Sequence, residues 1–183
     1  MDGLIIKPSK EFTVDCYADA DFAGLFSVED PQDVTSVRSR TCYVLTFAGC
    51  PILWASKLQT EIALSTLHAE YVALSQSLRD LLPIKELVIE LLGGMGVDSR
   101  RLKFISKSTI YEDNNGAIRV ATCPKLTPTS KFIAVKYHWF RQHVESGSFH
   151  IVKLESSKQL ANIFTKGLQG EKFLAIGMLL CGW

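Results

Sequence analysis

The order in which strand-like and helix-like segments follow one another is the sequence feature that most constrains this chain. Residues 12–19, 41–48 and 51–55 are rich in β-branched and aromatic residues and predict three successive strands. A loop over about residues 24–39 separates the first two, and Gly49 predicts a hairpin turn between the second and the third. The folded part therefore starts with three strands before any helix.

Helical spacing then dominates the rest of the chain. A long apolar stripe runs from Leu67 to the glycine pair at 93–94, which predicts the helix end, and Pro83 is expected to break or kink this helix. Short strands are expected at 109–113 and 149–154. Further helices are expected at residues 114–122, 133–144, 157–166 and 171–180. This order predicts an α/β fold with a mixed five-stranded sheet flanked by helices.

Length and composition narrow the class of protein. A chain of 183 residues fits one domain and is long enough to bury a core. Apolar residues make up 47% of it and charged residues 21%, which is typical of a globular protein rather than a disordered one. No apolar run reaches the roughly 18 residues of a membrane span, and the N-terminus lacks a signal-peptide pattern. We therefore expect an intracellular protein without a membrane partner.

Cysteine, histidine and charge patterns carry less information. The 5 cysteines include no CxxC pair, and with the 4 histidines they form no recognisable zinc-ligand spacing, so free thiols in a reducing compartment are expected. The net charge of +1 gives no overall signature of nucleic-acid binding, although lysines are frequent in the last third of the chain. From charge alone, an ordinary solvated surface is the favoured interpretation of those lysines.

Carboxylates stand at positions that could bring them together. Asp19 and Asp21 lie where the first strand ends, Asp113 ends the fourth strand, and Glu70 borders the buried stripe of the long helix. Ligands collect at strand ends in open α/β sheets, and neighbouring carboxylates repel unless a cation such as Mg²⁺ or Mn²⁺ lies between them. The pattern alone also allows simpler roles, with Asp19 in a turn, Asp113 capping the next helix, and Glu70 an ordinary border residue.

Six segments of the chain follow one another in an order that carries further information. These are residues 17–24 (YADADFAG), 39–43 (SRTCY) with 54–59 (WASKLQ), 63–74 (ALSTLHAEYVAL), 112–118 (EDNNGAI), 130–133 (SKFI) with 137–141 (YHWFR), and 159–166 (QLANIFTK). In this order they resemble the motifs of ribonuclease H domains in copia-type retrotransposon polyproteins, which include a reverse transcriptase. Each motif is weak alone, but the match runs collinearly from about residue 4 to 180.

The resemblance implies a ribonuclease H-like fold and a two-metal endonuclease that cuts the RNA strand of an RNA–DNA hybrid. In that family four carboxylates hold two Mg²⁺ ions, for which Mn²⁺ can substitute, and Asp19, Glu70 and Asp113 match three of them. Asn162 stands at the fourth position. No small-molecule cofactor is implied. Residues 1–11 would connect to a reverse transcriptase domain of the same polyprotein and residues 12–183 would form the ribonuclease H-like domain, in the cytoplasm, a virus-like particle or the nucleus.

Substrate contacts are expected on either side of the metal residues. A hybrid is recognised by its groove shape, its 2′-hydroxyls and its phosphates. Asn114 and Asn115 are candidates for the RNA backbone, while Lys131, Lys136 and Arg141 are candidates for the DNA strand. Asn115 fits equally well as a helix-start residue, and exposed lysines are common on helices. The sequence assigns no role to Asp21 or His138.

Four positions depart from the family pattern. Asn162 replaces an acid, and its lack of charge should weaken one metal and slow hydrolysis. His68 stands where a second glutamate is usual, Phe132 replaces a histidine, for which simple packing is the preferred interpretation, and Cys42 replaces a glycine. Several changes together favour a drifting genomic copy over a single engineered mutation.

Three functional interpretations follow. The first is an active ribonuclease H, the second a degenerate domain that keeps the fold and some hybrid binding, and the third a protein-interaction remnant. The retained Asp19, Glu70 and Asp113 argue against the third, and Asn162 argues against the first at full activity. We therefore expect reduced or absent cleavage with the metal site partly intact.

Overall fold

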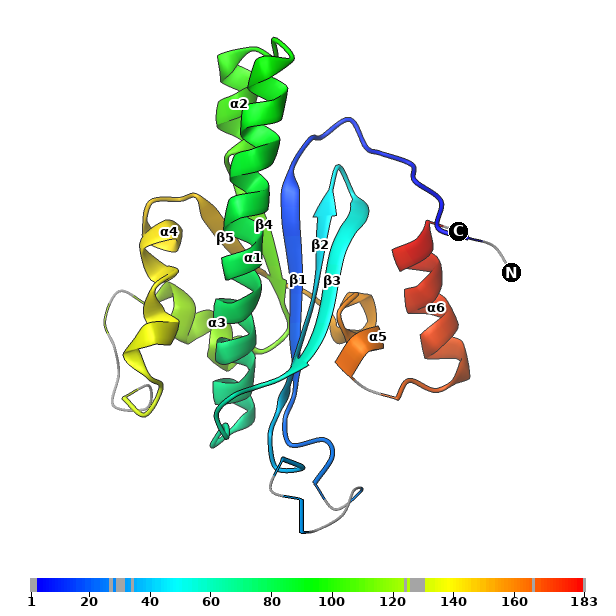
Figure 1. Ribbon diagram of the computed structural model, residues 1–183, viewed down its shortest axis with the longest axis vertical. Helices are drawn as coiled ribbons and strands as arrows, with labels where there is room; N and C mark the ends of the chain where they lie inside the picture. The colour runs from blue at the N-terminus through cyan, green and yellow to red at the C-terminus, as the bar shows by residue number, and fades with distance from the viewer. Residues whose placement is uncertain are drawn as a thin grey trace.

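A five-stranded mixed sheet forms the centre of the protein (Figure 1). The computed structural model describes residues 3–26, 28, 32–33, 35–123, 125, 131–165 and 167–182. The strands are β1 (Val14–Asp21), β2 (Arg40–Phe47), β3 (Cys50–Leu58), β4 (Ser108–Glu112) and β5 (Phe149–Lys153), in the spatial order β3-β2-β1-β4-β5. The first three pair antiparallel, while β4 runs parallel to both β1 and β5. The predicted α/β class and mixed five-stranded sheet are confirmed.

Helices cover both faces of this sheet. They are α1 (Thr66–Gly94), α2 (Ser99–Ile105), α3 (Asn115–Thr122), α4 (Arg141–Glu145), α5 (Asn162–Thr165) and α6 (Gly170–Cys181), with 3-10 turns η2 (Val135–His138) and η3 (Ser156–Lys158). Helix α1 packs on β1 and β2, whereas α5 contacts β1, β2 and β3 and α6 contacts β3. Figure 1 shows α1, α3 and α4 on one side of the strands and α5 and α6 on the other.

Strand alternation divides the apolar side chains between two clusters. Cys16, Ala18 and Leu45 point into the larger cluster, which includes Leu74 and Leu78 of α1. The opposite face carries the cluster of Val44, Leu160 and Ile176. Because successive strand residues face opposite sides, a sheet with apolar residues on both faces must be covered twice. The C-terminal helices supply the second cover.

The hairpin between β2 and β3 follows the prediction made from Gly49. Ala48 and Gly49 form a two-residue connection with φ angles of 50° and 78°, and Phe47 pairs with Cys50 across it. Two consecutive positive φ angles match the right-handed twist of the strands that such a turn joins. A glycine adopts this conformation without the steric cost that a Cβ atom brings.

The long helix differs from the prediction at Pro83. Helix α1 is continuous over 29 residues, with Pro83 inside it, and it ends at Gly94 as predicted. A proline in a helix interior costs about 3 kcal/mol. Leu78 and Leu81 on one side of it and Lys85 on the other are buried, and a buried leucine side chain contributes about 1.5–3 kcal/mol. Tertiary packing therefore offsets the lost backbone hydrogen bond and the helix does not break.

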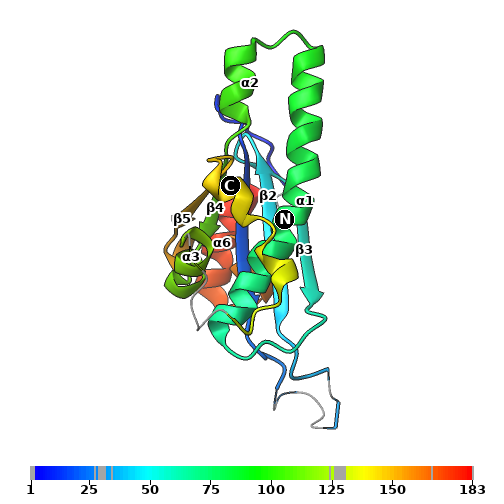
Figure 2. The same cartoon turned by 90° about the vertical axis from the view of Figure 1, so that its left-hand side faces the viewer.

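Three other helical segments also differ from expectation. Helix α2 was not predicted, and it lies alongside the end of α1 beyond the sheet (Figure 2). The expected helix at 133–144 is divided into η2 and α4, and that at 157–166 into η3 and α5. The sequence also predicts a loop at residues 123–130, which contains Pro124 and Pro128, and this stretch lies largely outside the described residues.

The segment before β1 contains no helix or strand from residue 3 to residue 13, and most of it is exposed. The amide of Ile5 donates to the Cys181 carbonyl at 2.8 Å, and that of Ser9 donates to the Ala48 carbonyl at 2.8 Å. Its assignment as a connector to another domain stays a prediction. Among the described residues, no helix has the length and apolar character needed to span a bilayer.

The turn glycine gives a test of the hairpin. Gly49→Ala should lower the free energy of unfolding by about 1 kcal/mol, because a left-handed conformation is unfavourable once a Cβ is present. A Cβ at Gly49 or at Gly177 meets no atom within 4 Å, so both changes report on the backbone alone. Gly177→Ala in helix α6 should raise the free energy of unfolding by a similar amount. Urea denaturation measures both, and a shift of the same sign in the two variants would contradict the assignment.

Candidate metal centre

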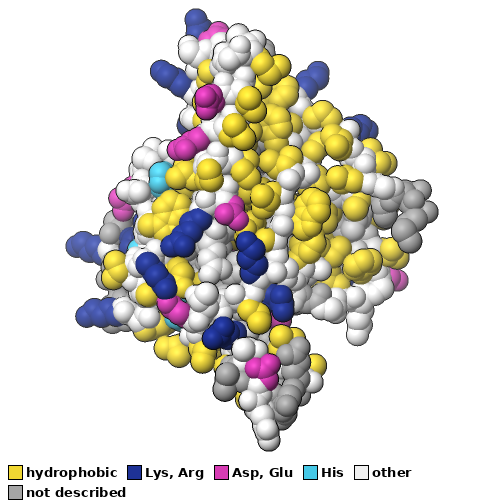
Figure 3. Space-filling view, in the orientation of Figure 1, with side chains coloured by type: hydrophobic (Ala, Val, Ile, Leu, Met, Phe, Trp, Pro, Cys, Tyr) yellow, Lys and Arg dark blue, Asp and Glu magenta, His cyan; other side chains and the backbone are white. Residues whose placement is uncertain are grey.

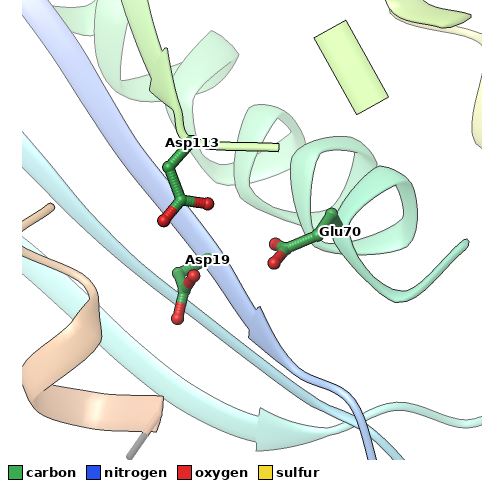
Figure 4. A group of neighbouring side chains, drawn as sticks. All are labelled: Asp19, Glu70 and Asp113. Atoms are coloured by element: carbon green, nitrogen blue, oxygen red, sulfur yellow. The ribbon is translucent and has the colours of Figure 1, made fainter. Parts of the chain in front are cut away.

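Three carboxylates, from strand β1, from helix α1 and from the residue that follows β4, converge beside the central strand (Figure 4). Asp19, Glu70 and Asp113 each offer an oxygen atom, and these atoms all lie within 4.8 Å of one another. Asp19 and Glu70 are buried and Asp113 is partly exposed. The structure thus brings together the three acids that the sequence singled out, while their catalytic and metal-binding roles stay predictions.

The register of the central strands explains how two of these acids meet. Strands β1 and β4 pair in parallel with Tyr17 opposite Tyr111, so Asp19 and Asp113 fall at the same level two residues further on. Because β4 ends at Glu112, Asp113 leaves the sheet beside Asp19. Asp19 lies within β1, and Asp21 is its last residue. The first strand therefore extends two residues beyond the predicted end.

Glu70 reaches the same point from helix α1. The helix begins after Ser65, whose side chain accepts a hydrogen bond from the His68 amide, and it packs over β1. Glu70 therefore lies in the second turn, on the side that faces the sheet, and is 7% exposed. A carboxylate this deeply buried is costly unless its charge is compensated.

The capping alternative for Asp113 is wrong. Helix α3 is capped by Asn114, whose side-chain oxygen accepts hydrogen bonds from the amides of Gly116 and Ala117. That oxygen of Asn114 is thus used within the fold, and Asn115 is the first residue of the helix. Whether either asparagine also contacts a substrate stays a prediction.

Hydroxyl groups from the C-terminal part of the chain contact two of the three acids. Thr165 donates its hydroxyl to Oδ2 of Asp19 at 2.5 Å, and Ser156 donates to Oδ2 of Asp113 at 2.5 Å. The ammonium group of Lys153 donates to the backbone carbonyl of Asp113. Sequence reasoning missed all three residues. Thr165 does lie in the motif at 159–166, but only Asn162 was singled out there.

Asn162 lies beside these contacts at the start of helix α5. It is 5% exposed, and its side-chain amide donates to the Ser156 carbonyl at 2.8 Å. The backbone carbonyl of Asn162 accepts a hydrogen bond from the Thr165 hydroxyl at 3.2 Å. The residue that the resemblance places at a fourth acidic position therefore contacts both Ser156 and Thr165.

Glu112 adds a fourth carboxyl group next to the three acids. It is fully buried, and its Oε1 accepts a hydrogen bond from the Asn114 amide. Burial raises the pKa of Glu112 well above its ordinary value, and the negative charges of Asp113 and Asp19 raise it further. The local environment thus disfavours any additional negative charge that no cation balances.

The remaining predicted substrate residues lie in different surroundings. Lys131 is exposed, and Lys136 is exposed and pairs with Glu61. Arg141 is only 9% exposed and donates to the Cys123 carbonyl. Arg141 is thus less accessible than the two lysines, and its contact with the DNA strand stays a prediction.

The positions that depart from the family motifs are also accounted for. His68 is 4% exposed, and its ring meets the ring of Phe132 edge-on with centroids 5.5 Å apart. Two of the departing residues therefore contact each other, although Phe132 is 43% exposed and its ring meets helix α1 rather than the helix expected to start beside it. Cys42 is buried with its sulfur 2.9 Å from the Phe164 carbonyl, and burial raises the pKa of this thiol to about 11.

Comparison with known proteins gives one consistent result. The chain is 32% identical over 157 residues to the retrovirus-related Pol polyprotein of transposon TNT 1-94 from Nicotiana tabacum. The matched region makes up 86% of this chain and 10% of that relative. Over 171 residues it is 29% and 30% identical to the retrovirus-related Pol polyproteins of transposons RE1 and RE2 from Arabidopsis thaliana. The matched region makes up 93% of this chain in both cases, and 10% and 11% of the two relatives. No family model matches.

This chain is related to retrovirus-related Pol polyproteins of plant transposons. The similarity extends over most of its length, so it applies to the fold as a whole and not to one motif. The chain spans about a tenth of the length of these relatives. It is therefore similar to one segment of each of these polyproteins.

His138, which had no assigned role, provides a test of the packing beside the site. Its Nδ1 lies 2.8 Å from the hydroxyl of the buried Tyr71, and burial lowers the pKa of His138 below its ordinary 6.5. The folded state thus prefers the neutral imidazole, so its contribution to stability should be lost as the pH falls from 6.5 through the folded-state pKa. His138→Gln should show a smaller loss of unfolding free energy between pH 7 and pH 5 than the wild type. Exposed His150→Gln is the control, and equal pH profiles in the wild type and both variants would contradict this.

The effect of the acidic cluster on stability can be tested with and without a divalent cation. In EDTA, Glu70→Gln should raise the free energy of unfolding by about 1 kcal/mol, because one of three mutually repelling charges is removed. In millimolar Mn²⁺ the melting temperature should rise for the wild type and not for the variant, since a ligand that binds the folded state stabilises it. The control is Glu90→Gln, the same change at an exposed position of helix α1. A Mn²⁺ response that survives in Glu70→Gln would exclude Glu70 as a ligand.

Proposed function

We propose that this chain is a ribonuclease H-type domain that hydrolyses the RNA strand of RNA–DNA hybrids with the help of two divalent metal ions. The observation that carries the proposal is the convergence of Asp19, Glu70 and Asp113 within 4.8 Å. The ribonuclease H-like topology of the sheet and the similarity to transposon Pol polyproteins support it. In the longer polyprotein, the partner of this domain would be the reverse transcriptase that synthesises the hybrid.

The residues present fit divalent cations. Three carboxylates that lie this close and this deep repel one another, and hard oxygen ligands are those that Mg²⁺ and Mn²⁺ prefer. Asp19, Glu70 and Asp113 would hold the ions, and Asn162 would offer only a neutral amide oxygen. When bound, the ions would lower the pKa of a coordinated water and stabilise the charge that develops on the leaving 3′ oxygen.

The protein's own groups would orient the reacting parts. Thr165 and Ser156 restrain the carboxylates of Asp19 and Asp113, so these side chains need little rearrangement before metal and substrate bind. The elements around the site also carry exposed cations, namely Lys57 on β3, Arg79 on α1 and Lys136 on η2. Figure 3 shows several Lys and Arg side chains near the middle of one face of the molecule, with Asp and Glu side chains among them. Such a group would attract the phosphates of both strands of a hybrid.

Asn162 favours reduced activity over full activity. An acid at this position would add a fourth negative charge next to the cluster, whereas the amide adds none and donates to the Ser156 carbonyl. With less negative charge, one of the two ions should bind more weakly. The second candidate function is therefore a domain that binds hybrids but cleaves them poorly. A pure protein-interaction remnant is disfavoured, because such a module has no use for three converging acids.

Cleavage of a labelled RNA–DNA hybrid in Mg²⁺ and in Mn²⁺ tests the proposal. We expect slow cleavage by the wild type and at least about tenfold faster cleavage by Asn162→Asp, because a carboxylate at this position adds charge for the weaker ion. Adding Asp113→Asn to that variant should abolish the activity. Asn162→Ala, which supplies no charge, is the matched control and should not gain activity.

The opposite results are equally informative. Absence of cleavage in the wild type and in Asn162→Asp, together with retained hybrid binding in a filter assay, would support the second candidate function. Cleavage that persists in the double variant Asn162→Asp/Asp113→Asn would place the chemistry elsewhere.

A further inference from the structure

Thr165 makes a buried side-chain contact with the acidic cluster. Its hydroxyl lies 2.5 Å from Oδ2 of Asp19, and the two residues are separated by 146 positions in the chain. Asp19 is fully buried and Thr165 is 7% exposed. A hydrogen bond from a hydroxyl to a carboxylate in such an environment is short and stronger than one between neutral groups.

The segment that carries Thr165 is attached firmly to the strands of the site. Gln159 is fully buried, and its side-chain amide donates to the carbonyls of Ala18 on β1 and Tyr111 on β4 at 2.9 and 3.2 Å. Strand β1 carries Asp19, and strand β4 ends directly before Asp113. Gln159 thus fixes the start of this segment directly against the backbone that positions the acids.

The other end of the segment is fixed against strands β2 and β3, on the far side of β1 from β4. The carbonyl of Phe164, the residue before Thr165, is 2.9 Å from the Cys42 sulfur and accepts a hydrogen bond from the Ser56 hydroxyl at 3.0 Å. Cys42 belongs to β2 and Ser56 to β3. Helix α5 is therefore held from β4 across to β3, and the position of the Thr165 hydroxyl is determined by contacts that do not involve the acids.

Repulsion between the three carboxylates makes the hydrogen bond from Thr165 to Asp19 important for the orientation of Asp19. The carboxylates of Glu70 and Asp113 lie close to that of Asp19 (Figure 4), and the repulsion between these charges favours rotation of the Asp19 carboxylate away from the other two. The Thr165 hydroxyl holds Oδ2 of Asp19 by a charge-assisted hydrogen bond. The rotation of the carboxylate is thereby restricted before any cation arrives.

We infer that Thr165 is a positioning residue for Asp19, which holds this carboxylate in the orientation that binds a divalent cation. The inference rests on the proposed function, because it assumes that the cluster binds metal. Groups that orient metal ligands typically change metal affinity by about 10- to 100-fold when they are removed. Thr165 contributes no ligand itself, so its effect should appear in metal affinity more than in the stability of the fold.

Mn²⁺ binding measured by calorimetry on the full chain tests this inference without relying on catalysis. Thr165→Val keeps the shape and removes the hydroxyl, and we expect its Kd for Mn²⁺ to rise by about tenfold. Thr165→Ser keeps the hydroxyl, and its Kd should stay within about threefold of the wild type. Thr122→Val is the matched control, since the Thr122 hydroxyl binds the Ile118 carbonyl on the exposed side of α3. Melting temperatures in EDTA accompany each titration, and Thr165→Ala carries the same expectation should the valine variant fail to fold.

The possible outcomes separate this inference from the proposed function. Equal Mn²⁺ affinity in the wild type and Thr165→Val would overturn the role of Thr165 and leave the metal site intact. Loss of binding in Thr165→Ser as well as in Thr165→Val would also overturn it, because a hydroxyl at this position would then not be sufficient for binding. A wild type that binds no Mn²⁺ at millimolar concentration would overturn the metal site, and the positioning role with it. Restoration of binding by serine, with unchanged binding in Thr122→Val, would support the inference.

Discussion

The parallel pairing of β1 with β4 is the interaction on which the candidate site depends. It sets Asp19 level with Asp113 at the point where β4 ends, and no other strand pair in the sheet brings two acids of the cluster together. Helix α1 packs across β1 and delivers Glu70 to the same point. A change of register by one residue would turn Asp19 to the opposite face of the sheet. The chemistry proposed for this chain therefore rests on backbone hydrogen bonds between two central strands.

The C-terminal segment completes the arrangement from the other face. Gln159, Asn162 and Thr165 lie within one motif, and each makes a different kind of contact near the cluster: with strand backbone, with Ser156 and with Asp19. Asn162, which the resemblance places at an acidic position, thus lies in a segment that contacts the strands at both ends. The contact between His68 and Phe132 joins two other departures from the family pattern.

Local patterns predicted much of this structure, and the failures have identifiable causes. Alternating and helical spacing located all five strands and the long helix to within a few residues, and Gly49 predicted the hairpin. Pro83 was misjudged because burial on both sides of it outweighs a local penalty. Helix α2 and the division of residues 133–144 were missed because short helices depend on their neighbours more than on their own spacing. The burial of Arg141 was likewise invisible, since a lone arginine in a sequence predicts exposure.

The sequence by itself determined the α/β class, the order of elements and the identity of three acids and one asparagine at motif positions. Those properties depend on residue type and spacing, which are local. Only the tertiary structure decided that the three acids share one location, that Asn114 rather than Asp113 caps α3, and that Thr165 contacts Asp19 across 146 positions. The physical reason is that strand pairing and helix docking join residues distant in the chain, and their distances are set by packing that no short stretch of sequence contains.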